Sequence, residues 1–214
     1  MDSQEPPLIQ HPGNVFVVSA PSGTGKSTLS QRLVERVPDL VFSISVTTRP
    51  PRPGEVEGQD YFFVDDAQFD AMVRAGDFVE WVQVYERRYG TSRPWLEQVL
   101  ASGKDVLLDI ETTGALNIRR AIPDAVMVFI LPPSAQALEA RLRGRGKDSE
   151  KQVALRLRHA RHEMDLYHAY DFLIVNDDLD RAYRQFESVI WATRARKERM
   201  LATAQAILGE FPKG

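Results

Sequence analysis

Short apolar runs, each bounded by polar or turn residues, recur along the chain and predict the strands of a sheet. They lie at 15–18, 41–46, 106–110, 125–131 and 172–175. Runs without polar alternation suit strands that are buried on both faces, as in a parallel sheet. Helical patterns lie between several of these runs. The order of elements therefore predicts an α/β fold in which helices wrap a parallel sheet.

Apolar positions spaced three and four residues apart predict the helices. One apolar stripe ends at Pro38, a second includes Leu138 and Leu142, and a third runs through residues 153–164. The segment 179–207, rich in Ala, Arg and Glu, is predicted to form one long helix. We interpret these stripes as faces that pack on the core.

Residues 47–93 break this alternation. They begin with the proline-rich segment TTRPPRPGEVEGQ, which cannot form a helix and offers little to a central strand. The aromatic and β-branched segments YFFV, FVEWVQVY and RRYGT then predict short strands, with a short helix around Phe69. A second irregular segment, RGRGKDSEKQ at 143–152, is predicted to be a mobile surface flap.

Composition narrows the function classes. The 214 residues are 43% hydrophobic and 27% charged, which suits one α/β domain with a sizeable core. A net charge of −3 without a long basic run disfavours nucleic-acid binding. The absence of cysteine excludes disulfides and thiol catalysis. The polar, proline-rich start MDSQEPPLIQHP does not resemble a signal peptide, and no run is long enough to span a membrane, so we expect a soluble cytoplasmic protein.

The most informative motif joins the first apolar run to a glycine-rich turn. In VFVVSAPSGTGKST, small residues allow a tight curl whose N–H groups converge on an anion, and the helix opening at Lys26 adds its positive end. Lys26 can reach phosphate oxygens, and the Ser27 hydroxyl can bind Mg²⁺. Ala20 replaces the first glycine of the usual motif, which requires a negative φ there. The segment predicts a nucleoside triphosphate site formed by Ala20, Pro21, Ser22, Gly23, Thr24, Gly25, Lys26, Ser27 and Thr28.

A second cluster suggests what receives the phosphoryl group. Arg49 and Arg52, followed by Tyr61 and Tyr89, offer two guanidinium groups and two phenols that suit a phosphate dianion. The alternative is a solvated basic loop with buried tyrosines. Glu80 interrupts an apolar strand, and its carboxylate could accept the adjacent N1–H and N2 amino groups of guanine, which adenine does not offer. The alternative is a solvent-facing glutamate.

Further charged residues suit phosphoryl transfer. Asp109 ends the apolar run VLLD, where an acid in phosphate-loop proteins holds Mg²⁺ or its water, although it could simply cap a turn. Glu111 would lie on the same side if the strand continued. Arg145 and Arg156, in the flap and the helix beyond it, could stabilise the developing charge when that segment closes, or could be surface charges. No general base is needed if the acceptor is an ionised phosphate.

The motifs APSGTGKST, SVTTRPPRPGEVEGQDYFFV, FVEW, YG, LLDIETTG, GRG and IVNDDLD, in this order and spacing, resemble guanylate kinases over nearly the whole chain. The resemblance implies the reaction ATP + GMP → ADP + GDP with Mg²⁺, with GMP or dGMP as acceptor. It also implies a tail at 1–12 and a single domain at 13–214. That domain would comprise a core (13–44, 94–134 and 168–214), a GMP-binding insertion (45–93) and a mobile lid (135–167).

The resemblance assigns roles to individual residues. The guanine pocket would be lined by Ser45, Glu80, Thr91 and Glu111, and the GMP phosphate would be held by Arg49, Arg52, Tyr61 and Tyr89. Asp109 would lie near both Mg²⁺ and GMP, and Asn176 near the adenine. The catalytic set would be Lys26, Arg49, Asp109, Arg145 and Arg156, with Arg141 a further lid arginine. Two alternatives stay open, a guanylate-kinase-like interaction module and a related kinase of a sugar phosphate, as does the choice between a monomer and a homo-oligomer.

Overall fold

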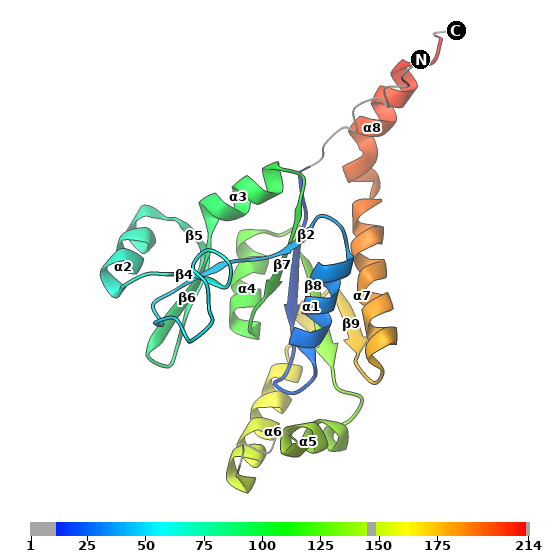
Figure 1. Ribbon diagram of the computed structural model, residues 1–214. Coiled ribbons are helices and arrows are strands. Elements are labelled where there is room, and N and C mark those ends of the chain that lie inside the picture. Colours follow the sequence, from blue (N-terminus) through cyan, green and yellow to red (C-terminus); the bar gives the residue numbers. More distant parts are fainter. Residues whose placement is uncertain (1–11, 145–148, 213–214) are drawn as a thin grey trace.

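A five-stranded parallel sheet forms the centre of the molecule. The computed structural model describes residues 12–144 and 149–212, and the sheet has the order β2-β7-β1-β8-β9 (Figure 1). Every pairing in it is parallel. The strands are β1 (Val15–Ser19), β2 (Leu40–Phe42), β7 (Asp105–Asp109), β8 (Val126–Leu131) and β9 (Phe172–Val175). The predicted α/β fold with a parallel sheet is confirmed.

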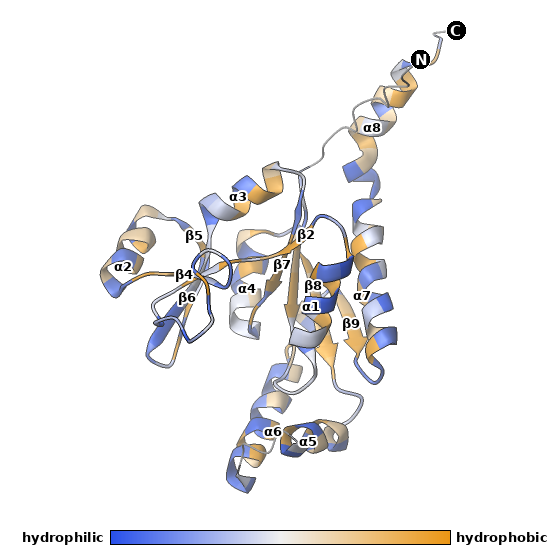
Figure 2. Cartoon of the chain, viewed as in Figure 1, coloured by the Kyte–Doolittle hydropathy of each residue, from blue (hydrophilic) through white to orange (hydrophobic). Residues whose placement is uncertain are grey.

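Helices cover both faces of this sheet. Alternate residues of β1 point to opposite faces, so that Phe16 packs with α1 (Lys26–Arg36) and α7 (Leu179–Arg194) on one side. Val17 packs with α3 (Arg93–Ala101) and α4 (Thr112–Ala121) on the other. Figure 2 shows the central strands as mostly apolar, whereas the flanking helices alternate polar and apolar residues. The uninterrupted apolar runs of the sequence are explained by this burial on both faces.

A smaller four-stranded sheet lies beside the central one, in the order β4-β3-β6-β5 (Figure 1). Its strands are β3 (Ser45–Thr47), β4 (Tyr61–Phe63), β5 (Phe78–Val84) and β6 (Arg87–Ser92), and α2 (Asp66–Ala75) packs on it through Phe69. The expected strands and short helix of this region are confirmed. The single run predicted at 41–46 is wrong, because β2 ends at Phe42 and β3, from Ser45, joins the other sheet.

Two helices below the central sheet pair with each other (Figure 1). They are α5 (Ala135–Gly144) and α6 (Glu150–Met164), and they enclose an apolar cluster of their own around Leu142 and Val153. The irregular segment predicted at 143–152 is wrong at both ends, because Gly144 ends α5 and a Ser149 capping box starts α6. Residues 145–148 lie outside the described residues. After α6 a short 3-10 helix, η1 (Tyr167–Ala169), leads into β9.

The single helix predicted at 179–207 is also wrong. It divides into α7 and α8 (Lys197–Gly209), with the backbone extended at Arg196. Helix α7 packs its apolar face on the sheet, whereas α8 buries no residue and projects from the body of the molecule (Figure 1). No proline or glycine marks the junction, so the sequence carries no break signal. None of the helices in the described part of the chain is long and apolar enough to cross a membrane.

Candidate active site

The glycine-rich turn joins the end of β1 to the start of α1. Gly23 and Gly25 have φ of 95° and 90°, which residues with a side chain rarely adopt. The Thr24 N–H and hydroxyl both donate to the Pro21 carbonyl, at 3.2 and 2.8 Å, and close the curl. Gly25 is the N-cap and has no side chain to cap α1, so the first N–H groups of the helix are open to an anion.

Alanine at position 20 is compatible with this curl. Among the described residues other than glycine, positive φ occurs at Asp39 and Tyr85, so Ala20 has the negative φ that its Cβ requires. The substitution of the first glycine of the motif therefore leaves the backbone path intact.

Asn176, directly after β9, is tied to the phosphate loop. Its Nδ2 donates to the Thr24 carbonyl at 2.7 Å, and Arg141 of α5 donates to the carbonyls of Asn176 (2.8 Å) and Thr24 (3.3 Å). A Cβ on Gly25 would lie 2.6 Å from Asn176 Nδ2, so the contact requires glycine. A cavity of about 320 Å³ opens here, lined by Gly23, Gly25, Thr28, Arg141, Asn176, Asp177 and Leu179.

Lys26 links the loop to the end of β7. Its ammonium forms an ion pair with Asp109 and donates to the Ile110 carbonyl at 3.3 Å. Ser27 follows on the first turn of α1 with an exposed side chain. From α6, Arg156 Nη1 donates to the Ser22 hydroxyl at 3.5 Å. Arg145 lies outside the described residues, so its predicted position is untested.

Four of the residues predicted to bind GMP form one row across the smaller sheet. In the strand register, Tyr61 of β4 pairs with Ser45 of β3, Ser45 with Thr91 of β6, and Thr91 with Glu80 of β5. Residues paired directly across strands share a face, so the four side chains point to the same side of the sheet. Tyr89 lies two residues before Thr91 and is therefore on that face too.

The Glu80 carboxyl is buried with one oxygen unused. Glu80 is 8% exposed, and the Thr91 hydroxyl donates to its Oε1 at 2.9 Å. Oε2 is buried without a hydrogen-bond partner in the described part of the chain. Burial raises the pKa of Glu80 to about 7, although the bond from Thr91 opposes the shift. Gly114 of α4 allows this approach, since a Cβ there would lie 3.3 Å from Oε2.

A cavity of about 340 Å³ lies between this sheet and the end of β7, and Glu80 is one of the residues that line it. Six predicted residues line it together, namely Ser45, Tyr61, Glu80, Tyr89, Asp109 and Glu111. The strand does not continue to Glu111: β7 ends at Asp109, and Glu111 is the N-cap of α4, a position from which it still lines the cavity. Gln83 and Thr113 also line it and were not predicted, because polar residues on a strand and a helix carry no local signal.

The two predicted phosphate-binding arginines differ in their surroundings. Arg49 lies 5.2 Å from the centre of the Tyr61 ring and makes two bonds to the Glu55 carboxylate, at 2.9 and 2.8 Å. This carboxylate raises the pKa of Arg49, which keeps the guanidinium charged. Arg52 is exposed, and its backbone N–H donates to Glu55 at 2.7 Å. Glu55 was not predicted, because one acid in a proline-rich loop has no distinctive pattern.

A further acid from α6 faces the same region and was also missed by sequence reasoning. Burial raises the pKa of Glu163, the nearby charge of Glu111 raises it further, and Lys26 opposes the shift. The sequence places Glu163 at the end of a charged helix, where nothing separates it from an ordinary surface residue.

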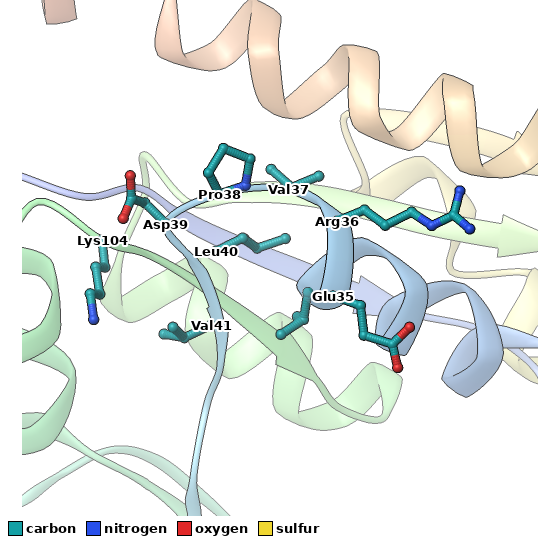
Figure 3. Close-up of a pocket in the computed structure, with 9 residues that line it drawn as sticks. Glu35, Arg36, Val37, Pro38, Asp39, Leu40, Val41 and Lys104 are labelled. Atoms are coloured by element: carbon teal, nitrogen blue, oxygen red, sulfur yellow. The ribbon is translucent and has the colours of Figure 1, made fainter.

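Another cavity, of about 380 Å³, lies at the opposite end of α1 and holds none of the predicted site residues. In Figure 3 the charged ends of Arg36 and Lys104 extend away from each other, so no convergent set of polar groups forms there. The candidate active site is therefore the pair of cavities beside the phosphate loop, which share no lining residue with this one.

Comparison with known proteins agrees with this geometry. The family model described as guanylate kinase matches residues 13–193. The chain belongs to the guanylate kinase family. It is 48% identical to a guanylate kinase of Rhodopseudomonas palustris over 94% of this chain and 92% of that protein. It is 49% identical to a guanylate kinase of Aromatoleum aromaticum over 86% of this chain and 91% of that protein.

The fold is shared with the same family. A crystal structure of guanylate kinase from Anaplasma phagocytophilum matches with a TM-score of 0.75 and 31% identity, covering 97% of this chain and all of that one. The family resemblance inferred from the motifs is confirmed.

Proposed function

We propose that this chain transfers the γ-phosphoryl group of ATP to GMP or dGMP, giving ADP and the guanosine diphosphate. The observation that carries the proposal is the row from Tyr61 to Glu80, which faces the same cavity as Asp109. Membership of the guanylate kinase family supports it over most of the chain.

The acceptor base would be read by the unused oxygen of Glu80. The Glu80 carboxylate has one oxygen held by Thr91 and the other buried without a partner in residues 12–144 and 149–212, so it offers acceptors but no donor. Guanine presents N1–H and N2–H side by side, whereas adenine presents no such pair. Binding guanine would satisfy an oxygen that is otherwise buried and unpaired, which is a strong source of selectivity.

The acceptor phosphate would be held near Arg49, Tyr61 and Tyr89. The Tyr61 and Tyr89 rings lie edge to face at 6.2 Å, and the Arg49 guanidinium lies over Tyr61. Arg49 is paired with Glu55, so we expect the phosphate to share or replace that partner. Arg52, which is exposed, would reach the phosphate from the rim of the cavity.

The donor would bind with its phosphates on the turn between β1 and α1 and its adenine toward Asn176 and Arg141. The Ser27 hydroxyl and the partly exposed Asp109 carboxylate are oxygen donors of the kind that Mg²⁺ takes together with phosphates and water. When bound, Mg²⁺ neutralises charge on the donor phosphates. Lys26 would hold the transferring phosphoryl group, and Arg156 of α6, with Arg145, would stabilise its charge when the proposed lid closes.

The competing functions lack comparable support. A scaffold module does not need an intact phosphate loop, yet Lys26, Ser27, Arg49 and Arg156 are all present. A kinase of a sugar phosphate has no use for a buried acid at position 80.

The deciding experiment is a coupled ADP-release assay that offers GMP, dGMP, AMP, CMP and UMP in parallel with ATP and Mg²⁺. We expect turnover with GMP and dGMP and at least a hundredfold lower kcat/KM with the other acceptors, because an unpaired buried polar group is costly. Equal rates with AMP and GMP would reject the assignment. Binding of GMP without any turnover would favour the scaffold module.

A further inference from the structure

A carboxylate in the proline-rich loop joins both of the predicted phosphate-binding arginines. Oε1 of Glu55 accepts from Arg49 Nη2 at 2.8 Å, and Oε2 accepts from Arg49 Nη1 at 2.9 Å. The Arg52 backbone N–H donates to Oε2 as well, at 2.7 Å. The bonds from Arg49, and then the bond from the Arg52 backbone, lower the pKa of Glu55, so the carboxylate is ionised at neutral pH. Glu55 thus ties Arg49 to the turn that carries Arg52.

The backbone on both sides of this ion pair is itself fixed. The Glu55 N–H donates to the Arg52 carbonyl at 3.0 Å, so two bonds in opposite directions close the turn from Arg52 to Glu55. Arg49 lies two residues after the end of β3, and its N–H donates at 3.1 Å to the hydroxyl of Thr47, which is fully buried. The carboxylate and the guanidinium are therefore held from defined backbone positions, which limits the entropy lost in aligning them.

The Arg49 guanidinium has two bidentate edges, and Glu55 takes one of them. That edge is formed by Nη1 and Nη2, and Nη1 also donates to the Pro50 carbonyl at 2.9 Å. The other edge, formed by Nε–H and the second Nη2–H, is used by neither Glu55 nor Pro50. The guanidinium also lies 5.2 and 5.9 Å from the ring centres of Tyr61 and Phe63, which restricts its plane. One complete edge is therefore left for an oxyanion.

We propose that Glu55 is a positioning residue for acceptor binding: it holds one edge of Arg49 and thereby presents the other edge to the phosphate of GMP. Glu55 itself does not touch the substrate. The phosphate would bind beside Tyr61 and Tyr89, which line the same cavity as Glu80, and would share the guanidinium with Glu55 rather than displace it. A guanidinium that is already oriented loses less conformational entropy when the phosphate binds. The proposal rests on the proposed function, since GMP is the acceptor there.

This role predicts a change opposite to the one expected from charge alone. Glu55 brings a negative charge close to the site of a phosphate dianion, so neutralising it would strengthen GMP binding if only Coulomb forces acted. Glu55→Gln keeps the size of the side chain, but its amide offers one acceptor and sets an NH₂ donor against the Arg49 donors. Arg49 then loses its orientation, and GMP binding should weaken about threefold to tenfold, the value of one hydrogen bond. The KM for GMP should rise by the same factor, whereas kcat at saturating GMP should change less.

Calorimetric titration with GMP and with guanosine measures this effect. Guanosine lacks the phosphate, so its affinity should be the same in Glu55→Gln as in the wild type. The matched control is Glu57→Gln, which removes the same charge from the same loop, because Oε2 of Glu57 accepts from the Phe63 N–H at 2.9 Å and not from Arg49. The control should leave both affinities within about twofold of the wild type, since the charge of the exposed Glu57 is screened by solvent and salt.

A double-mutant cycle shows whether Glu55 acts through Arg49. Arg49→Lys keeps the charge but has no bidentate edge, so it should weaken GMP binding, and adding Glu55→Gln should weaken it no further. Stronger or unchanged GMP binding in Glu55→Gln, an equal loss of guanosine binding, or fully additive losses in the cycle would each overturn the proposal. A wild-type protein that binds GMP more tightly than guanosine but transfers no phosphoryl group would reject the proposed function instead, and the titrations would still decide the role of Glu55.

Discussion

Thr91 Oγ1 donates to Oε1 of Glu80 at 2.9 Å, while Oε2 of the same carboxyl is buried and has no hydrogen-bond partner among the described residues. The Thr91 hydroxyl thus orients the carboxyl group, and Oε2 is left to accept a hydrogen bond from a ligand in the cavity that Glu80 lines. Removing the charge should damage base recognition more than it damages the fold. We expect Glu80→Gln to raise the KM for GMP more than tenfold, because an amide offers one acceptor and adds a competing donor. Steady-state kinetics at several GMP concentrations measure this, and an unchanged KM would remove Glu80 from base reading.

The raised pKa of Glu80 gives GMP binding a pH dependence. Guanine N–H groups require the ionised carboxylate, and the pKa of Glu80 is about 7 rather than its usual 4.5. Affinity for the guanine base should therefore rise as the pH rises from 6 to 8. Calorimetric titration with guanosine is the measurement, because guanosine has no phosphate that titrates in the same range. A flat profile in the wild type, or an equal slope in Glu80→Gln, would contradict the prediction.

The same group should have the opposite effect on the stability of the protein without nucleotide. Because the pKa of Glu80 is raised on folding, the folded chain holds a proton that the unfolded chain releases between about pH 4.5 and 7. The contribution of Glu80 to the free energy of unfolding therefore falls as the pH rises through this window. Urea unfolding at pH 5 and pH 8 should show a larger loss in the wild type than in Glu80→Gln.

Lys26 is expected to be required for transfer. Its ammonium is poised by Asp109 and the Ile110 carbonyl at the loop that would hold the donor phosphates. Lys26→Ala should lower kcat by about a hundredfold or more, as the loss of one transition-state charge contact does. Lys104→Ala, which removes an exposed lysine beside another cavity, is the control and should retain wild-type kcat. Similar rates in the two variants would contradict the assignment.

Gly25 tests the link between the phosphate loop and Asn176. An alanine Cβ there would meet Asn176 Nδ2 at 2.6 Å on a backbone with φ of 90°. We expect Gly25→Ala to lower kcat/KM for ATP more than tenfold, because the bond from Asn176 to the loop must shift. Gly76→Ala places the same Cβ at φ of 74° in open space, so it should cost only the strain of about 1 to 2 kcal/mol. If both variants lose only stability, the contact has no role in donor binding.

A buried ion pair far from the site should control stability alone. Asp105, 2% exposed, accepts from the Asn14 backbone and side chain and pairs with Arg194 Nε at 2.7 Å. Arg194→Met should lower the free energy of unfolding by about 3 kcal/mol, because it leaves a buried charge without its partner. The exposed pair of Arg161 with Asp165 provides the control, and Arg161→Met should cost less than about 1 kcal/mol. Urea titrations compare the two.

The parts of the molecule that follow from local pattern could be predicted. Continuous apolar runs predicted the parallel sheet, and the glycine-rich turn with Lys26 predicted the phosphate loop. The division of 41–46 between two sheets could not be predicted, because a change of partner sheet leaves no mark in an apolar run. The break at Arg196 has no proline or glycine to announce it. The roles of the individual site residues stay predictions. More of these roles follow from the resemblance to the family motifs than from the chemistry of single residues.

Residues that act through tertiary contacts were missed for a common reason. Ser19 reads as an ordinary core position at the end of a strand, and only the fold brings its hydroxyl to the Ile110 carbonyl. Glu163 reads as one more charge on a polar helix. Glu55 gains its importance from the bidentate bond to Arg49, which a loop sequence does not disclose.

Because strand pairing aligns Tyr61, Ser45, Thr91 and Glu80, the length of the β5–β6 hairpin matters more than the identity of its tip. Side chains alternate faces along a strand, so lengthening one arm by a single residue would turn Glu80 outward and present Val79 or Trp81 instead. The exposed tip at Tyr85 should accept many substitutions but no insertion or deletion of one residue. Selectivity for the base would thus depend on the number of residues in the hairpin. Substitutions at its tip could accumulate during evolution as long as that number stayed the same.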